Sequence, residues 1–480
     1  MNKGAVIIFC SLFLFVAMLV FNPLSLEVKA QHALAIAVLM VVLWVTEVLP
    51  MPVVALLPIV LFPLLGIADT AETTAPYANP AIFLFMGGFM IGLAIEKWDL
   101  HRRIALTVVS FTGTGGSRII LGFILATGFL SMWLSNTATT MMMYPIALSV
   151  VQVLEKGREY DKGVHNMAIC LLMSIAYASN FGGIATLVGT PPNVAYAAFL
   201  EKQYDYTFAF SDWMIIGFPM ALLLMISLYF VMTRWLFKTQ LKDEAEARQV
   251  IQTELRTLGE LKVSEKRVLA VFGFTAFLWI FRGFINKLTG LSLDDNLIAI
   301  FGGVMLFLIP SGDKSGIGKT LLHWEDTGKL SWGILLLFGG GITLANQLEK
   351  AGLIGKLGEW MATGAGSNIL LLIFIITLAS IFISELLSNV AQVIVFAPVI
   401  SGMADAMTVD PLLLATPMVF AASCASMLPM GTPPNAIVFA SGRLKLSDMI
   451  KTGLVMNLIA VVLITLFCYF ILPAVVSGIR

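Results

Sequence analysis

The chain has 480 residues, no net charge at neutral pH and a pI of about 6.9, a balance that argues against nucleic acid as a partner. Hydrophobic residues make up 59% of it, charged residues only 12%, and the mean hydropathy is +0.93, which excludes an ordinary soluble domain. Several uncharged stretches reach the ~20 residues that a bilayer-spanning helix needs. The clearest are residues 4–26, 119–154, 167–200, 213–233, 361–384 and 452–479. These stretches lack the alternating polarity of a β-barrel, so we predict an all-α polytopic membrane protein in a lipid bilayer.

The residues typical of catalysis and of metal binding are sparse. The four cysteines stand singly in apolar segments, and no Cys or His spacing resembles a metal site. No nucleophile–base constellation appears either. We therefore expect neither an enzyme nor an organic cofactor.

The first hundred residues read as a set of membrane helices. Residues 4–22 follow a basic Lys3 but lack a small-residue cleavage site, so we expect a retained helix rather than a signal peptide. Four prolines within residues 33–66 predict two short or kinked helices. We assign residues 1–105 to the scaffold helices of a first half.

A polar run, Ser-Met-Trp-Leu-Ser-Asn-Thr at residues 131–137, interrupts the next uncharged stretch. Divided there, each arm has about 16–18 residues and a length of about 24–27 Å. Such arms are shorter than the ~30 Å hydrocarbon core, so we predict a re-entrant hairpin with its tip at mid-membrane. Ser131 and Ser135 are spaced i, i+4, which predicts that both hydroxyls lie on one face of the incoming helix.

The pentapeptide Gly-Thr-Pro-Pro-Asn at residues 189–193 breaks the following apolar run. Because proline has no N–H to donate, two prolines in succession predict an unwound stretch inside this helix. With the next span, residues 106–236 form a unit of hairpin, broken helix and following helix. Residues 237–267 are dense in charges of both signs, and we predict a cytoplasmic, partly helical linker there.

The second half of the chain repeats the first. Ser131, Ser135 and Asn136 recur 253 positions later as Ser384, Ser388 and Asn389. At the same offset, the pairs Gly87-Gly88 and Glu96-Lys97 recur as Gly340-Gly341 and Glu349-Lys350, and the pentapeptide recurs at residues 431–435. We predict scaffold helices at 268–357 and a second hairpin, broken helix and last helix at 358–480. Duplicated halves with broken helices indicate a secondary transporter, and we expect the two repeats to be inverted.

The two polar runs offer hydroxyls, amides and half-helix ends, with no cluster of Lys or Arg. Half-helix N-termini suit a carboxylate, and unwound carbonyls suit a small hard cation such as sodium. We therefore expect two cation sites flanking one anion. A single Ser-Asn-Thr run would more simply mediate helix packing, but its paired recurrence favours a site. Glu385 stands where the first run has Met132; it is either a satisfied buried carboxylate or a titratable group that makes transport pH-sensitive.

Over nearly the whole chain, these motifs resemble those of the divalent anion:sodium symporter family, the dicarboxylate, citrate and sulfate carriers. The resemblance implies an inverted-repeat homodimer whose transport domain moves like an elevator against a scaffold domain. It implies one sodium site at Ser131, Ser135, Asn136 and Gly189, and a second at Ser384, Leu387, Asn389 and Gly431. It implies a substrate site at Asn136, Thr137, Ser388, Asn389, Val390, Thr190, Thr432 and Pro433. Val390 departs from the repeat, because it lacks the hydroxyl that Thr137 has.

The preferred function is sodium-coupled import of C4-dicarboxylates such as succinate, malate and fumarate across a bacterial cytoplasmic (inner) membrane. A sodium-independent dicarboxylate exchanger, or a sulfate or citrate carrier of the same fold, is the alternative. An anion channel is less favoured, because channels need a continuous polar pore and the polar breaks here are local.

Overall fold

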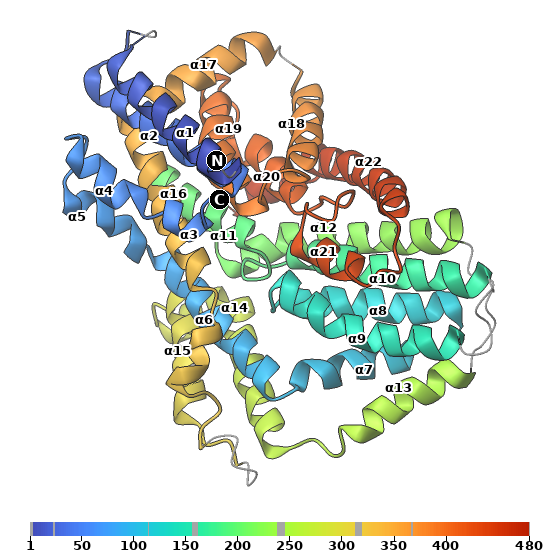
Figure 1. Cartoon of the computed structure of the whole chain (residues 1–480). Coiled ribbons are helices and arrows are strands. Elements are labelled where there is room, and N and C mark those ends of the chain that lie inside the picture. Colours follow the sequence, from blue (N-terminus) through green and yellow to red (C-terminus); the bar gives the residue numbers. More distant parts are fainter. Residues whose placement is uncertain are drawn as a thin grey trace.

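The computed structural model describes residues 3–22, 25–113, 115–155, 162–237, 245–312, 319–365 and 368–479. Within these ranges the regular structure is helical (Figure 1), apart from an isolated bridge between Pro310 and Thr320. Eight helices of this part of the chain are long and apolar enough to cross a membrane. They are Val28–Thr46, Thr70–Lys97, Asn136–Glu155, Gly163–Gly183, Phe210–Leu236, Val263–Thr289, Asn389–Ala406 and Leu446–Ser477. The predicted all-α polytopic membrane fold is confirmed.

The first half runs from α1 to α12. Its helices are α1 (Lys3–Val20), α2 (Val28–Thr46), α3 (Met51–Val54), α4 (Leu57–Leu64), α5 (Thr70–Thr74), η1 (Ala75–Ala78), α6 (Pro80–Lys97), α7 (Leu100–Thr112), α8 (Gly116–Ser131), α9 (Asn136–Glu155), α10 (Lys162–Gly183), α11 (Pro191–Tyr204), α12 (Phe210–Phe230) and η2 (Val231–Leu236). The proline-rich region forms three helices instead of the predicted two, because α2 stays regular up to Thr46 and the prolines lie in α3 and α4.

The second half follows the same order. Its helices are α13 (Ala245–Thr257), α14 (Val263–Thr289), α15 (Asp295–Leu308), η3 (Trp324–Lys329), α16 (Trp332–Lys350), α17 (Leu353–Ala365), α18 (Ile369–Ser384), α19 (Asn389–Ala406), α20 (Pro411–Ala422), α21 (Pro433–Phe439), α22 (Leu446–Phe470) and α23 (Leu472–Ile479). Between the halves, α13 packs on α7 and α9, and Arg102 forms an ion pair with Glu254.

Both predicted hairpins have their tips at the polar runs. In the first, α8 ends at Ser131 and α9 begins at Asn136; in the second, α18 ends at Ser384 and α19 begins at Asn389. The incoming helices α8 and α18 have 16 residues each, about 24 Å of helix. Since α8 stops at Ser131, Ser135 lies in the tip, and the prediction that the two hydroxyls share a helical face was wrong.

Both broken helices resume at the first proline of the pentapeptide. Pro191 opens α11 and Pro433 opens α21, where a residue without an N–H costs nothing because the first helical N–H has no intrahelical partner. The preceding Thr190 and Thr432 are extended, with φ of −143° and −145°. The asparagine of each pentapeptide donates its side-chain amide to carbonyls of its own unwound segment. The free carbonyls of each break are thus partly satisfied by the asparagine of the same segment.

Two reciprocal ion pairs relate α6 to α16. Lys97, at the end of α6, pairs at 2.5 Å with Asp326 in the segment before α16. Lys350, at the end of α16, pairs with Glu72 in the segment before α6. The two helices also contact each other, so they run in opposite directions.

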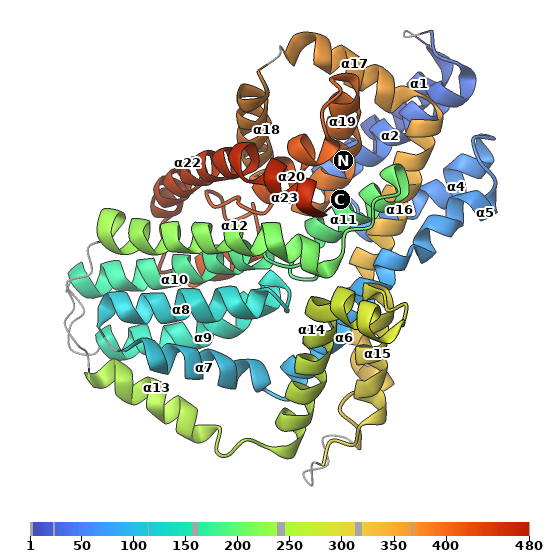
Figure 2. The same cartoon turned by 180° about the vertical axis from the view of Figure 1, so that it is seen from behind.

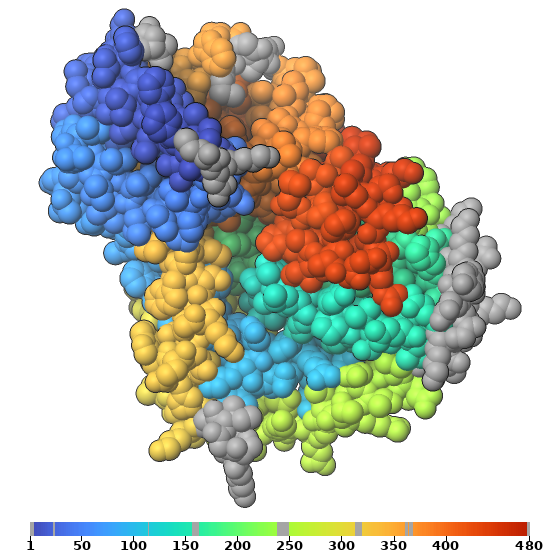
Figure 3. Space-filling model, viewed as in Figure 1, coloured from blue at the N-terminus to red at the C-terminus, as the bar shows by residue number. Residues whose placement is uncertain are grey.

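The helices form two groups. Helices α8, α9, α10 and α12 lie side by side with α20, α21 and α22 against them, whereas α1–α6 and α14–α16 form the other flank (Figures 1 and 2). In the space-filling view the C-terminal segment, in red, lies directly against the teal residues of α9 and α10, which α21 contacts (Figure 3). The halves are therefore interleaved. The predicted domain boundaries at 105, 236, 267 and 357 stay a prediction.

Candidate functional site

Three oxygen atoms converge at the end of α8. The Ser131 hydroxyl lies 2.7 Å from the Asn136 amide oxygen and 2.7 Å from the Ser179 carbonyl of α10. A hydroxyl carries one proton, so it can donate to only one of these two acceptors. The three oxygens therefore offer more acceptor positions than the hydroxyl can fill, a donor set that suits a small hard cation. Ser131 is fully buried, which strengthens the effect of a bound charge.

The end of α18 has the same arrangement. The Ser384 hydroxyl lies 2.7 Å from the Asn389 amide oxygen and 2.6 Å from the Ala422 carbonyl of α20. Ser384 is also fully buried. The structure thus places Ser131 with Asn136, and Ser384 with Asn389, in two matching oxygen clusters.

Gly189 belongs to the first cluster because of its close backbone contacts. A Cβ at Gly189 would lie 2.5 Å from the Gly183 carbonyl and 3.0 Å from the Ser131 carbonyl. A Cβ at Gly183 would lie 2.5 Å from the Asn136 amide oxygen and 3.2 Å from the Gly189 carbonyl. Only glycine allows the unwound backbone to approach the hairpin tip this closely. The predicted set of Ser131, Asn136 and Gly189 is therefore assembled, with Gly183 as a member that sequence reasoning missed.

Ser135 has a different role in the structure from the one expected. Its hydroxyl accepts a 3.2 Å hydrogen bond from the Ala138 N–H at the start of α9. This contact caps the helix, since it satisfies one of the N–H groups that lack an intrahelical partner. Ser135 lies on the same tip as Ser131 and Asn136.

Gly431, a predicted member of the second site, lies against a buried acid. A Cβ at Gly431 would be 2.8 Å from Glu385 Oε2 and 3.3 Å from the Leu428 carbonyl. Leu387 lies on the hairpin tip between Ser384 and Asn389 and is half-buried. The predicted members of the second site thus share one tip and the facing unwound segment.

Glu385 is a satisfied buried carboxylate, the first of the two alternatives considered for it. Its side chain accepts hydrogen bonds from the N–H groups of Ser426, Met427 and Leu428 at 2.8–2.9 Å. A fourth, of 2.7 Å, comes from the Asn457 side chain of α22. Sequence reasoning missed Asn457, although an asparagine in the uncharged stretch 452–479 is itself a signal.

Four helix N-termini begin around the two tips. They are those of α9 at Asn136, α11 at Pro191, α19 at Asn389 and α21 at Pro433. The N-termini of α9 and α19 carry partial positive charge from N–H groups without an intrahelical partner, so the tips suit an anion although they have no Lys or Arg. The first two residues of α11 and of α21 are prolines without an N–H, and the next N–H, of Asn193 or Asn435, donates to Thr190 or Thr432, so these two N-termini contribute less. Thr137, Ser388, Asn389 and Val390 are half-buried, Thr190 and Thr432 are buried and Pro433 is exposed.

Two residues of α10 connect the first half to the second at this point. The Asn180 amide donates a 3.0 Å hydrogen bond to the Thr432 hydroxyl, and the Tyr177 hydroxyl donates one of 2.8 Å to the Ser426 carbonyl. Asn180 also accepts from the Asn136 amide at 3.4 Å. Sequence reasoning missed both residues, whose polar groups in an apolar span were the available signal.

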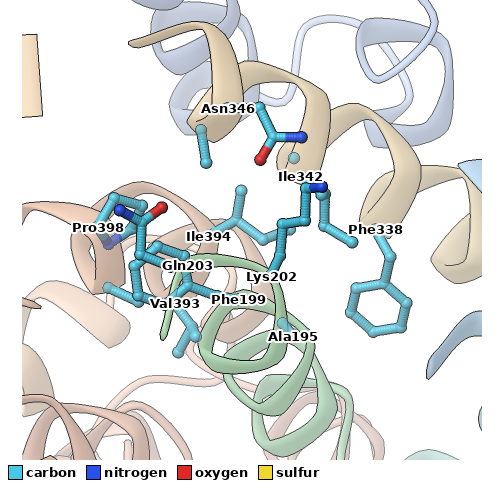
Figure 4. Close-up of a pocket in the computed structure, with 13 residues that line it drawn as sticks. Ala195, Phe199, Lys202, Gln203, Phe338, Ile342, Asn346, Val393, Ile394 and Pro398 are labelled. Carbon is cyan, nitrogen blue, oxygen red and sulfur yellow. The ribbon is translucent and has the colours of Figure 1, made fainter. Parts of the chain in front are cut away.

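The pockets lie to one side of these residues. A cavity of about 380 Å³ is bounded by η1, the start of α6, α16 and Lys202. A narrower pocket adjoins it between α11, α16 and α19 (Figure 4). Phe338, Ile342 and Ile394 form its apolar wall, and Lys202, Gln203 and Asn346 its polar side. None of the predicted sodium or substrate residues lines either pocket; they lie on the hairpin tips and on or next to the unwound segments.

The chain is similar to known membrane transport proteins. A family profile, the sodium:sulfate symporter transmembrane region, matches residues 3–475. The sodium-dependent dicarboxylate transporter SdcS of Staphylococcus saprophyticus is 38% identical over 465 residues, which cover 96% of this chain and 89% of that protein. SdcS of Staphylococcus aureus strain USA300 is 37% identical with the same coverage.

Two solved structures have a similar fold. The YdaH transporter of Alcanivorax borkumensis matches with a TM-score of 0.59 and 13% identity over 83% of this chain and 87% of that one. MtrF of Neisseria gonorrhoeae, described among antimetabolite efflux pumps, matches with a TM-score of 0.55 and 13% identity over 95% and 97%. At this identity the likeness shows the fold alone. The profile match over nearly the whole length and the identity to full-length relatives show that the chain belongs to the sodium:sulfate symporter family, integral membrane transporters and not enzymes.

Proposed function

We propose that this protein is a sodium-coupled importer of C4-dicarboxylates such as succinate, malate and fumarate in a bacterial cytoplasmic membrane. The observation that carries the proposal is the pair of matching oxygen clusters, Ser131 with Asn136 and Ser384 with Asn389. The relatives named sodium-dependent dicarboxylate transporters support the choice of ion and of substrate class.

Each cluster binds one sodium ion. The first site consists of Ser131, Ser135, Asn136 and Gly189; the second consists of Ser384, Leu387, Asn389 and Gly431. A cation relieves the oxygen–oxygen approach that one hydroxyl proton cannot satisfy. Two sodium ions also balance the two negative charges of a dicarboxylate, which crosses a low-dielectric barrier at high cost without them.

The dicarboxylate lies between the two tips. One carboxylate contacts Asn136 and Thr137, and the other contacts Ser388 and Asn389 beside Val390. Thr190, Thr432 and Pro433 complete the site at the starts of α11 and α21. The N-termini of α9 and α19 stabilise the two carboxylates without a basic side chain. The two ends of the substrate are held differently, because Val390 has no hydroxyl.

The transport mechanism is that of an elevator with inverted repeats in a homodimer. The reciprocal pairs Lys97–Asp326 and Lys350–Glu72 support inversion, because they require α6 and α16 to run in opposite directions. The scaffold consists of residues 1–105 and 268–357, the moving part of residues 106–236 and 358–480, and residues 237–267 link the two repeats.

Uptake of labelled succinate into liposomes that contain the purified protein tests the function. An inward sodium gradient is expected to drive accumulation of succinate. A gradient of potassium or choline is not expected to do so. Equal uptake in all three salts, with acceleration by internal succinate, would establish the sodium-independent exchanger instead. Competition by sulfate or citrate, but not by fumarate, would reassign the substrate.

A further inference from the structure

The side chain of Asn180, in the last turn of α10, bridges the two halves of the site. It is 1% exposed, so water does not compete for its hydrogen bonds. Its Nδ2 donates a 3.0 Å hydrogen bond to the Thr432 hydroxyl, and its Oδ1 accepts one of 3.4 Å from Asn136 Nδ2. Asn136 belongs to the first oxygen cluster, and Thr432 precedes the second broken helix. A buried amide thus connects the cation cluster of one repeat to a substrate residue of the other.

The Thr432 hydroxyl is oriented by its contacts. Its oxygen accepts from Asn180 Nδ2 and, at 3.4 Å, from the Asn435 N–H. A hydroxyl has two acceptor positions and one proton, so both acceptor positions are filled. Among the described residues the proton has no acceptor, and a buried donor without a partner is costly. A carboxylate oxygen of a bound substrate removes this cost.

The direction of these hydrogen bonds is set at Asn136. Its Oδ1 lies 2.7 Å from the Ser131 hydroxyl, and its Nδ2 faces Asn180. A cation at the first cluster requires this orientation, because an NH₂ group would direct positive charge at the ion. Asn180 must then present its oxygen to Asn136 and its NH₂ to Thr432. If both amides were turned over, Thr432 would donate to Asn180 and its proton would not be free for a substrate.

The second repeat has no matching connection. Ser423 takes the place of Asn180 there, since each directly follows the carbonyl that faces the serine of its cluster. Ser423 is fully buried, and within the described ranges its hydroxyl has no hydrogen-bond partner. Thr190, the counterpart of Thr432, makes no side-chain capping bond. The connection therefore runs in one direction, from the first cluster to the threonine of the second repeat.

We propose that Asn180 is a positioning residue that couples sodium to substrate. Sodium at the first cluster fixes the Asn136 amide, Asn180 transmits this orientation, and the Thr432 hydroxyl donates to a carboxylate of the substrate. We call these three side chains the relay. It sets donor and acceptor roles only, so no bond breaks and no proton is transferred. Without sodium the relay can take the reversed direction, and the affinity for the substrate falls. The inference rests on the function proposed above and adds to it a residue that contacts neither ion nor substrate.

Asn180→Leu tests the relay, because leucine is similar in volume and has neither donor nor acceptor. At saturating sodium we expect the KM for succinate to rise about tenfold, the worth of one hydrogen bond to a charged group, and kcat to change by less than about twofold. Ser423→Ala is the matched control and is expected to leave KM unchanged, because it removes a hydroxyl without a described partner. An unchanged KM for Asn180→Leu would overturn the proposal.

A double-mutant cycle separates this role from a merely structural one. Thr432→Val removes the hydroxyl that the relay orients and is expected to raise KM as Asn180→Leu does, whereas Thr432→Ser keeps a hydroxyl and should retain a KM near that of the parent. Once Thr432→Val is present, Asn180→Leu is expected to add nothing, because Asn180 acts through Thr432. Effects of the two substitutions that multiply would show that Asn180 only supports the fold, and the proposal would be wrong.

Thermal unfolding of the purified protein in detergent gives a measurement that needs no transport. Sodium alone is expected to raise the Tm of the parent and of both variants, which keep the first cluster, whereas succinate added to sodium should raise it further in the parent only. If Asn180→Leu does not fold, Asn180→Asp takes its place, since it keeps the shape and the acceptor for Asn136 but has no N–H for Thr432. A succinate-dependent rise as large in Asn180→Asp as in the parent would overturn the relay. A parent protein that binds succinate in sodium but does not accumulate it in liposomes would contradict the proposed function alone.

Discussion

The Asn457 side chain of α22 donates a 2.7 Å hydrogen bond to the Glu385 carboxylate, and its own oxygen accepts one of 3.2 Å from the Ser426 N–H. This pair ties the last long helix to the second hairpin tip and to the unwound segment that carries Gly431. The first repeat has Met132 in place of the acid, so only the second site has this support.

Replacing Glu385 by glutamine is expected to destabilise the protein. The glutamine NH₂ would face an N–H group that now donates to the carboxylate, and an unsatisfied buried donor costs about 1–3 kcal/mol. Thermal unfolding of the purified protein in detergent should show a lower Tm. Met132→Leu, at the equivalent position of the first repeat, is the matched control and should unfold like the parent protein. A Glu385→Gln variant as stable as the parent would show that the four hydrogen bonds contribute little.

Loss of either cluster amide is expected to abolish sodium-driven uptake. Asn136→Ala and Asn389→Ala each remove an oxygen from one cluster. Sodium should raise the Tm of the parent protein, because a ligand that binds only the native state stabilises it. This rise should shrink in each variant. Asn286→Ala removes a hydrogen bond to the Leu293 carbonyl, away from the tips, and should leave the sodium-dependent rise in Tm unchanged. Near-normal uptake by Asn136→Ala or by Asn389→Ala would mean that the sodium site is misplaced.

Alanine at Gly189 is expected to eliminate transport and to lower the yield of folded protein. The added Cβ would lie 2.5 Å from the Gly183 carbonyl, closer than any real Cβ contact, so the unwound segment would have to move. Gly273→Ala in α14 is the control, since a Cβ there meets nothing within 4 Å. The control should keep its activity and gain slightly in stability, as helical Gly→Ala changes do. Uptake assays and size-exclusion profiles of both variants check this prediction.

Substitutions of Thr137 and of Val390 should change the KM for the substrate in opposite directions, because the two residues lie at opposite ends of it. Thr137→Val removes a hydroxyl and is expected to raise KM for succinate by about three- to tenfold, the worth of one hydrogen bond. Val390→Thr supplies a hydroxyl at the second end and is expected to lower KM or to change the order of preference among dicarboxylates. Kinetics at saturating sodium separate these effects from cation binding. Unchanged KM in both variants would place the substrate elsewhere.

The Lys97–Asp326 pair is expected to stabilise the protein except in acid. Burial opposes ionisation of Asp326, but hydrogen bonds from Lys97 and from the His323 N–H outweigh it and lower the pKa of this carboxyl below its ordinary value. A lowered folded-state pKa contributes stability that is complete above the ordinary Asp pKa and is lost as pH falls through the folded-state value. The Tm difference between the parent and Asp326→Asn should therefore be largest near neutral pH and vanish in strong acid. A difference that does not change with pH would indicate that packing, not charge, is responsible.

The sequence predicted the breaks in the helices almost to the residue. Both polar runs lie between two helices and both pentapeptides lie at a break, as expected, although the two prolines open the next helix and the unwound stretch lies just before them. These features depend on local chemistry: proline lacks an N–H, and polar groups inside an apolar run need partners near at hand. For the same reason, the second copy of each feature could be recognised in the sequence. The prediction that Ser131 and Ser135 share one helical face was wrong, because the exact end of a helix depends on what packs against it.

Composition and local pattern therefore sufficed to identify an all-helical membrane protein, its two hairpins, its two broken helices and the polar residues at their tips. Other features could not be read from the chain. The partners of Glu385 lie 41 to 72 positions away, and nothing local in the sequence names them. Val188 and Met430 occupy equivalent places in two repeats, yet Val188 is buried and Met430 is exposed. A local pattern is the same in both repeats, whereas the burial of each residue depends on long-range packing, that is, on which other helices lie against it.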